Sequence, residues 1–238
     1  MDRAGSFAKV RRRLDERDDI DVVAFDRAGY GSRVDDPLPT GRGRVAADTT
    51  DLLERLDGAD DQVVVIGHSY GGHVAMAAAI RRPDLVGAIG IFETPVAWMP
   101  WWPPDTSGGV AVRAAERGAP ADAAEAFMRS IVGDDVWARL PPITKAARLA
   151  EGPALLADMA DIRCEPPPYD PADVTVPVVV GRGSQSKGQH LLGTEALLGL
   201  LPDAVLHVVD GAGHGAHASH PAGFVEFVEA AVRRRRTP

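Results

Sequence analysis

The stretch QVVVIGHSYGGHVAMAAAI, residues 62–80, joins an apolar run to a segment of small side chains through a glycine-rich turn. The run at 62–67 has the length and β-branched content of a buried strand, and 71–80 suits a helix packed tightly against a sheet. Between them, Gly67-His68-Ser69-Tyr70-Gly71 matches the G-x-S-x-G pattern, in which a sharp strand-to-helix turn exposes a serine hydroxyl. Ser69 is therefore the candidate nucleophile.

Apolar runs and helical patterns alternate on both sides of this stretch, which predicts an α/β fold with a mostly parallel sheet flanked by helices. The helix expected over 6–17 has Ser6 as its N-cap and one apolar face that includes Val10 and Leu14. Further helices are expected at 48–60, near 189–200 and over 221–236, and further buried strands at 21–26, 85–92, 174–181 and 204–210.

The rhythm changes between about residues 95 and 170, where a Pro- and Trp-rich stretch is followed by two or three amphipathic helical patterns without intervening strands. This pattern predicts a helical cap inserted between two strands. We expect one domain, in which 1–94 forms the first part of the α/β core, 95–170 the cap insertion and 171–238 the second part of the core.

Composition argues against several classes of protein. The net charge of −8 disfavours a nucleic-acid surface, and we expect the terminal Arg233–Arg236 to cap the last helix. The lone Cys164 indicates a reducing compartment without an internal disulfide. No apolar run approaches the roughly 18 residues of a membrane span, and no signal-peptide pattern is present. We expect a cytoplasmic protein that acts on a small molecule, with no nucleic-acid or membrane partner and at most a second copy of itself.

A serine hydroxyl needs a base, and seven histidines are available. His214 lies in a Gly-rich loop directly after the last predicted strand, at the carboxyl edge where α/β sheets place their ligands, and is the expected base. His217 is the rival in the same loop, and His73 is expected to pack. We expect His68 to shape the elbow and border the substrate site. The others carry no comparable context: His190, His207 and His220.

Two further features concern the substrate. The predicted helix at 71–80 points its first amides at Ser69, so the backbone N–H of Tyr70 is the expected oxyanion donor. Large apolar side chains open the cap, and we expect them either to line an apolar substrate pocket or simply to pack the cap: Trp98, Met99, Trp101 and Trp102.

Three stretches together resemble the α/β-hydrolase superfamily, and more closely its small, capped, esterase-like members: FDRAGYGSR (25–33), GHSYGG (67–72) and GAGHGAH (211–217). The resemblance runs from residue 1 to about 232 and implies a triad of nucleophile, acid and base. We expect Asp26 and Arg27, in the first stretch, to be structural.

The acid of the triad needs care, because many family members carry an aspartate after the strand that follows the cap. Here that place reads VVVGRGSQSKG (178–188), without a carboxylate. The family also uses a position after the strand that precedes the cap, where this chain has Glu93. We expect Glu93 to orient His214. The alternatives are that Glu93 is structural and that Asp210 takes the role, although Asp210 reads as a turn former.

Family members also begin with two or three more strands, and the third of these ends in a His-Gly loop with a second oxyanion donor. This chain starts at MDRAGSFAKV, which resembles the stretch just after that loop. We hypothesise that Met1 is an internal methionine of a longer protein, and that the chain alone is unstable or inactive.

The expected function is hydrolysis of a carboxylic ester-like bond through an acyl-enzyme, with no metal or organic cofactor. Two alternatives stay open. One is perhydrolase- or lyase-like chemistry on the same triad, since a fold does not determine a reaction. The other is a non-catalytic family member that only binds.

Overall fold

The computed structural model describes residues 1–17, 19–59 and 61–236. The chain forms two compact units, each assembled from separate parts of the sequence. The helical unit contains Met1–Ala4, Phe25–Arg44 and Ala97–Glu165, and the sheet unit contains Gly5–Ala24, Val45–Val96 and Pro166–Pro238. None of the helices within the described ranges is long and apolar enough to cross a membrane.

The sheet unit is built on four parallel strands in the order β1-β2-β3-β4. They are β1 (Val63–His68), β2 (Val86–Phe92), β3 (Val178–Gly183) and β4 (Ala204–Val209). The register pairs His68 with Phe92 and Gly183 with Val209, so the carboxyl ends of the strands meet along one edge. This confirms the predicted α/β fold with its parallel sheet.

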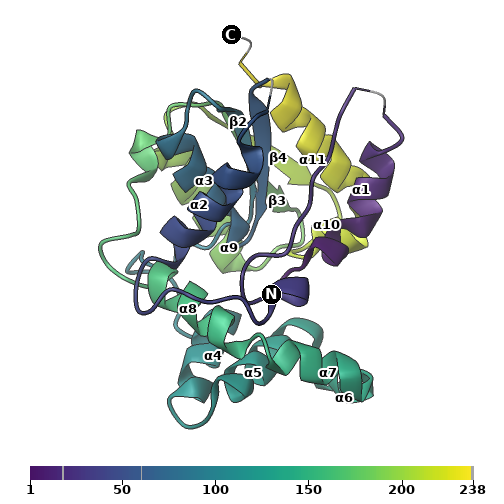
Figure 1. The fold of residues 1–238 in the computed structure, drawn as a ribbon, viewed down its shortest axis with the longest axis vertical. Helices are drawn as coiled ribbons and strands as arrows, with labels where there is room; N and C mark the ends of the chain where they lie inside the picture. Colours follow the sequence, from purple (N-terminus) through teal and green to yellow (C-terminus); the bar gives the residue numbers. More distant parts are fainter. Residues whose placement is uncertain (18, 60, 237–238) are drawn as a thin grey trace. The chain divides into compact units, whose positions relative to one another are not determined.

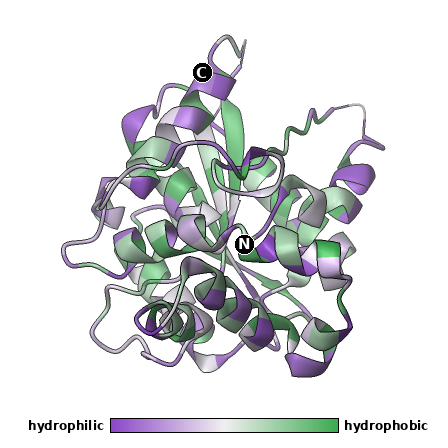
Figure 2. Ribbon diagram, turned by 60° about the horizontal axis from the view of Figure 1, so that its bottom comes forward, coloured by the Kyte–Doolittle hydropathy of each residue, from purple (hydrophilic) through white to green (hydrophobic). Residues whose placement is uncertain are grey.

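Helices cover both faces of this sheet (Figure 1). On one face α1 (Ala8–Leu14) packs on α11 (Pro221–Arg233), and on the other lie α2 (Arg44–Leu56) and α3 (Gly71–Arg81). A further helix, α9 (Gly188–Leu200), contacts β3 and β4. Both hydrophobic and hydrophilic residues occur along the helices of the protein (Figure 2). Helix α3 consists mostly of small, apolar, buried residues, as expected for a helix packed tightly against a sheet.

The apolar face predicted for the first helix is confirmed, because Val10 and Leu14 are buried in a core cluster with Phe92, Phe224 and Phe227. The predicted N-cap is wrong. Ser6 lies inside a 3-10 turn, Ala4–Phe7, and the α-helix begins only at Ala8 with Phe7 in the cap position.

The strand expected at 21–26 does not form. The backbone there makes no sheet ladder, Val23 is 81% exposed, and β1 is the edge strand of the sheet among the described residues. The apolar, β-branched pattern of DVVAFD supplies a preference for extended backbone. A strand also needs a neighbour for its N–H and C=O groups, and none is available to this segment in the described structure.

The helical unit contains five α-helices where two or three were expected, and no strand among its described residues. They are α4 (Ser107–Ala115), α5 (Pro120–Val132), α6 (Asp134–Arg139), α7 (Pro142–Leu149) and α8 (Gly152–Ile162). Helix α5 contacts the other four. Short elements complete the chain: 3-10 turns at Gly31–Arg33 and Pro171–Asp173, and α10 (Ala216–Ser219).

Within the helical unit, a buried carboxylate holds the 25–44 segment to α8. Asp158 accepts hydrogen bonds from both terminal nitrogens of Arg27, at 3.1 and 2.7 Å, and from the Tyr30 hydroxyl at 2.7 Å. Asp26 accepts from the backbone N–H groups of Ala4 and Ser32. These contacts are internal to the unit and agree with the structural roles expected for Asp26 and Arg27.

Candidate active site

The turn between β1 and α3 is the sharp elbow that the sequence predicts. Ser69 has a φ of 52°, in the left-handed region that residues with a side chain rarely adopt. Such a conformation costs roughly 1–2 kcal/mol for a non-glycine residue. It is held in place by the hydrogen bond from the Ser69 N–H to the carbonyl of Phe92, at 2.8 Å, which ties the elbow to β2.

Two glycines make the elbow sterically possible. One is Gly67, which belongs to the motif, and the other is Gly72, which follows it. A Cβ on Gly67 would lie 2.3 Å from the carbonyl oxygen of Gly71, and one on Gly72 would lie 1.7 Å from Thr94 Oγ1. A Cβ on Gly71 would meet nothing within 4 Å. Gly67 of the motif therefore relieves crowding at the elbow, whereas Gly71 does not, and Gly72, just outside the motif, takes that role.

Glu93 follows β2 at the same edge of the sheet, 2% exposed, with a φ of 46°. Within the described residues, Ser69 and Glu93 are the only two that adopt a positive φ without being glycine. Strained backbone of this kind persists where the surrounding structure enforces it, and it is concentrated at functional sites. Both strained residues are candidate site residues.

The Glu93 carboxylate has hydrogen-bond partners on both oxygens. Oε2 lies 2.9 Å from His214 Nδ1, in the loop after β4. Oε1 accepts a hydrogen bond from the Gly183 N–H at 2.9 Å and another from the Ser186 hydroxyl. The 178–188 segment, which lacks a carboxylate, thus supplies donors to the carboxylate of the neighbouring strand.

The rival acid, Asp210, is engaged elsewhere. Its Oδ1 accepts from the Ser184 hydroxyl at 3.0 Å, and the Ser184 oxygen accepts from the Gly211 N–H at 2.8 Å. These bonds close the turn after β4, as expected for a turn former.

The loop that carries His214 lies against the elbow. His68 Nε2 is 2.7 Å from the carbonyl oxygen of His214, and the two rings are 4.6 Å apart between centroids. Residues 69 and 214 therefore stand at the same sheet edge. The described contacts include no hydrogen bond between Ser69 and His214, and catalytic hydrogen bonds of this kind often tighten only when substrate is bound.

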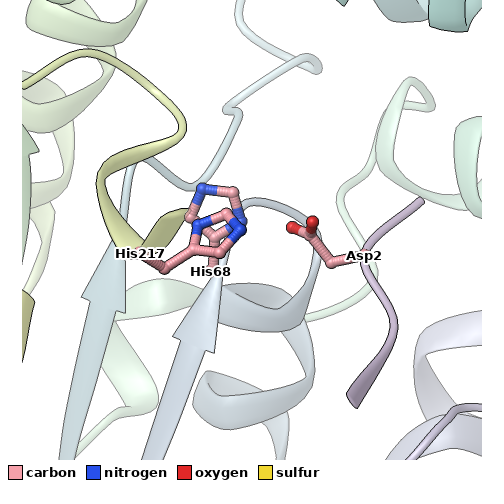
Figure 3. A group of neighbouring side chains, drawn as sticks. All are labelled: Asp2, His68 and His217. Atoms are coloured by element: carbon pink, nitrogen blue, oxygen red, sulfur yellow. The ribbon is translucent and has the colours of Figure 1, made fainter. Parts of the chain in front are cut away.

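The two other histidines near the elbow pack. His217, from α10, lies beside His68 with ring centroids 4.5 Å apart (Figure 3), and its ring also stacks on that of Phe7 at 4.6 Å and meets that of Phe224 at 6.0 Å. His73 Nδ1 lies 2.7 Å from the hydroxyl of Tyr169. Neither His217 nor His73 contacts Glu93 among the described interactions, whereas His214 Nδ1 lies within hydrogen-bonding distance of it.

His190 is the site residue that the sequence interpretation missed. It comes from the first turn of α9, and its ring stacks on that of His214 with centroids 4.5 Å apart and planes 20° from parallel. Its Nδ1 is 3.7 Å from Glu93 Oε2, the oxygen that His214 contacts. One signal could have found it: the helix it begins follows β3, so its first turn lies at the same edge as Ser69.

The environment sets the charges of this cluster. Burial raises the pKa of Glu93, but the hydrogen bond with His214, the attraction that His190 exerts in its protonated form and the bonds from Gly183 and Ser186 outweigh it and lower this pKa to about 2. Burial and the charge of His214 lower the pKa of His190 to about 3. At neutral pH Glu93 is thus an anion and His190 is neutral, so His214, Gly183 and Ser186 are the partners that stabilise the anion.

Glu93, His190 and His214 also place three metal-ligating atoms within 4.8 Å of one another. A ring nitrogen binds a metal along a lone pair in the plane of the ring. Because the two rings are nearly parallel, their lone pairs lie in separate stacked planes and do not converge on one point. The arrangement fits a hydrogen-bonded acid–base cluster better than a metal centre.

Comparison with known proteins agrees with this geometry. Residues 3–227 match the profile of the Alpha/beta hydrolase family, which is nearly the whole chain. The chain belongs to the alpha/beta hydrolase family.

Solved structures of other alpha/beta hydrolases share the fold. An esterase from Thermogutta terrifontis, solved with malate bound, is 22% identical, with a TM-score of 0.70 over 99% of this chain and 87% of its own. A hydrolase from Oleispira antarctica is 15% identical, with a TM-score of 0.72 over 98% and 88%. Lipase LipV of Mycobacterium tuberculosis is 44% identical over 54 residues, which are 22% of this chain and about a fifth (21%) of that lipase. The two solved structures show that the fold is shared, and membership of the family supports a hydrolase activity in general.

The roles expected for Tyr70 and for the four cap residues of this alpha/beta hydrolase remain predictions. Tyr70 is the N-cap of α3, and its side chain is buried. The four cap residues belong to the helical unit, where Trp102 is buried, Trp101 is 42% exposed, and Trp98 and Met99 are intermediate. The triad candidates belong to the sheet unit.

The elbow predicts opposite outcomes for two neighbouring glycines. Gly67→Ala should lower the free energy of unfolding by about 1–3 kcal/mol, because its new Cβ would overlap backbone atoms that cannot move away. Gly71→Ala is the matched control and should be neutral or slightly stabilising, since it adds a methyl group in open space on a helix. Urea unfolding of both variants measures the difference, and equal stabilities would contradict the described elbow.

The lowered pKa of Glu93 predicts a pH-dependent contribution to stability. A carboxylate with a depressed pKa stabilises the fold above its ordinary pKa of 4.5, and that contribution is lost as the pH falls from there towards about 2. Glu93→Gln should therefore be less stable than the wild type at pH 7, and the gap should narrow below pH ~4.5. Urea unfolding of both proteins across this range tests it; a gap that is constant with pH would contradict the lowered pKa of Glu93.

Proposed function

We propose that this alpha/beta hydrolase is a serine hydrolase that cleaves a carboxylic ester-like bond of a small, apolar substrate through an acyl-enzyme. The observation that carries the proposal is the contact of Glu93 with His214 at the sheet edge where the strained elbow presents Ser69. The esterase and lipase among the similar proteins support an ester as the substrate.

In the proposed first half-reaction, the Ser69 oxygen attacks the carbonyl carbon of the ester while His214 Nε2 accepts the serine proton. The imidazolium that forms is stabilised by the Glu93 carboxylate at Nδ1. The oxyanion of the tetrahedral intermediate accepts a hydrogen bond from the Tyr70 N–H, at the positive end of α3. When the intermediate collapses, His214 returns the proton to the departing alkoxide, and the acyl group remains on Ser69.

Water completes the proposed cycle. His214 takes a proton from the water, whose oxygen attacks the acyl carbon, and then returns the proton to the Ser69 oxygen as the carboxylic acid leaves. Every step is a proton or acyl transfer, so the proposal requires no metal or organic cofactor. We propose an apolar substrate because large apolar side chains open the cap in the sequence.

Ser69→Ala tests the nucleophile. The variant should lose hydrolysis of p-nitrophenyl acetate by at least about a thousandfold, because removing a triad member leaves only binding and the oxyanion donor. It should also lose labelling by a fluorophosphonate probe. Ser219→Ala, at an exposed serine of α10, is the control and should keep both.

Two outcomes of that experiment would contradict the proposed serine hydrolase activity. One is hydrolysis by Ser69→Ala at the wild-type rate. The other is a wild-type protein that the probe does not label at Ser69, which would favour a family member that only binds. Perhydrolase chemistry would be favoured instead by a wild type that is labelled but forms peracid from hydrogen peroxide and acetate far faster than it hydrolyses esters.

Glu93→Gln and Asp210→Asn together test the acid. Glu93→Gln should lower kcat by about a thousandfold to ten-thousandfold, because the amide no longer stabilises the imidazolium and favours the wrong tautomer of His214. Asp210→Asn should keep kcat close to that of the wild type, since Asp210 holds a turn. Steady-state assays at pH 7 measure both, and the reverse ranking would assign the role to Asp210.

A further inference from the structure

We propose that His190 is a positioning residue that packs flat against His214, confines its ring to the orientation in which Nδ1 faces Glu93, and keeps water from that face of the ring. The inference rests on the proposed function and adds a residue that lies outside the triad. It explains why a second imidazole is buried beside the first.

The contact geometry is specific. The rings of His190 and His214 are stacked at 4.5 Å and 20° from parallel, and both Nδ1 atoms approach the same Glu93 oxygen, at 3.7 and 2.9 Å. The His190 side chain is 14% exposed. A planar group in this position allows the His214 ring little rotation about its Cβ–Cγ bond, because a rotated ring would collide with the plane above it.

His190 can take this position only as a neutral ring. A charged imidazolium would repel the imidazolium that His214 becomes during catalysis and would compete with it for Glu93. The groups that face His190 are His214 and Glu93 from the neighbouring strand ends, His68 from β1 and Lys187 at the start of its own helix; of these, only Glu93 favours a charge on His190. The positive end of α9 disfavours that charge as well.

Holding the His214 ring in one orientation and shielding it from water should have separate effects on the kinetics. A ring held in one orientation affects the rate of proton transfer and leaves substrate binding unchanged, so its loss appears in kcat and not in KM. A face shielded from water destabilises the imidazolium, so exposing it raises the pKa of His214. A merely structural residue would produce neither effect.

The test compares two substitutions at one position. His190→Ala removes the planar ring and admits water: kcat for p-nitrophenyl acetate should fall about tenfold to a hundredfold with KM within about twofold, and the acid limb of the kcat/KM profile should move to higher pH. His190→Phe restores a flat ring that carries no charge, so it should recover most of kcat and return the acid limb to its wild-type position. His207→Ala, on β4 and in contact with Phe227, is the control and should match the wild type.

Thermal unfolding of each variant checks the fold. If His190→Ala is unfolded, His190→Leu replaces it, because leucine fills the volume without a planar face. A ring-less variant with wild-type kcat and pH profile overturns the proposal. So does a folded His190→Phe that is as slow as the ring-less variant, because the nitrogens and not the plane would then matter.

A second measurement separates this inference from the proposed function. The pKa of His214, followed by NMR titration of its ring protons in wild type and His190 variants, needs no turnover. If the wild type shows no Ser69-dependent hydrolysis, the proposed function fails, whereas a rise of the His214 pKa in His190→Ala that His190→Phe reverses still supports the packing. If hydrolysis is present and this pKa does not move, only the His190 inference fails.

Discussion

The buried carboxylate of Glu93 is the constraint on which the arrangement at the sheet edge depends. An ionised group at 2% exposure is costly unless its oxygens are hydrogen-bonded, and here each oxygen has a partner. Gly183 is the last residue of β3, Ser186 lies in the loop after it, and His214 lies in the loop after β4. One anion therefore joins three strand ends, and it needs all of them to be stable.

The parallel sheet makes this convergence possible. Because its strands run in one direction and their registers align their carboxyl ends, the residues that follow β1, β2, β3 and β4 emerge side by side. The elbow at Ser69 and the strained backbone of Glu93 both begin one residue after a strand, where the chain must leave the sheet sharply. The hydrogen bond from the Ser69 N–H to the carbonyl of Phe92 links the turn after β1 to the end of β2.

A row of imidazoles extends from this anion. His190 stacks on His214, His214 approaches His68, and His68 approaches His217, each at about 4.5 Å between ring centroids. Of these four rings in the described structure, that of His214 has its Nδ1 within hydrogen-bonding distance of Glu93, at 2.9 Å. The imidazoles thus differ in their distance to the Glu93 carboxylate, which is 2.9 Å for His214 and 3.7 Å for His190. The burial that makes His190 neutral also strengthens the pairing of Glu93 with His214.

Local pattern and elementary chemistry were enough for much of this protein. Apolar periodicity located four strands of the sheet. The glycines around Ser69 indicated an elbow, because a backbone that approaches as closely as at Gly67 leaves no room for a side chain. Pattern misled where an outcome depends on a partner. The run at 21–26 has the composition of a strand but pairs with no other strand among the described residues, and Ser6 has the chemistry of a cap but lies in a 3-10 turn.

The sequence by itself determined the α/β class and the candidate nucleophile, since both follow from residues adjacent in the chain. It favoured Glu93 over Asp210 as the acid without any geometry to separate them, and it gave His190 no role. Only the tertiary structure decided that Glu93 contacts His214, that Asp210 closes a turn and that His190 lies on the His214 ring. Those contacts join residues 24 to 121 positions apart, and a hydrogen bond or a stacked ring depends on angstroms that no spacing along the chain encodes.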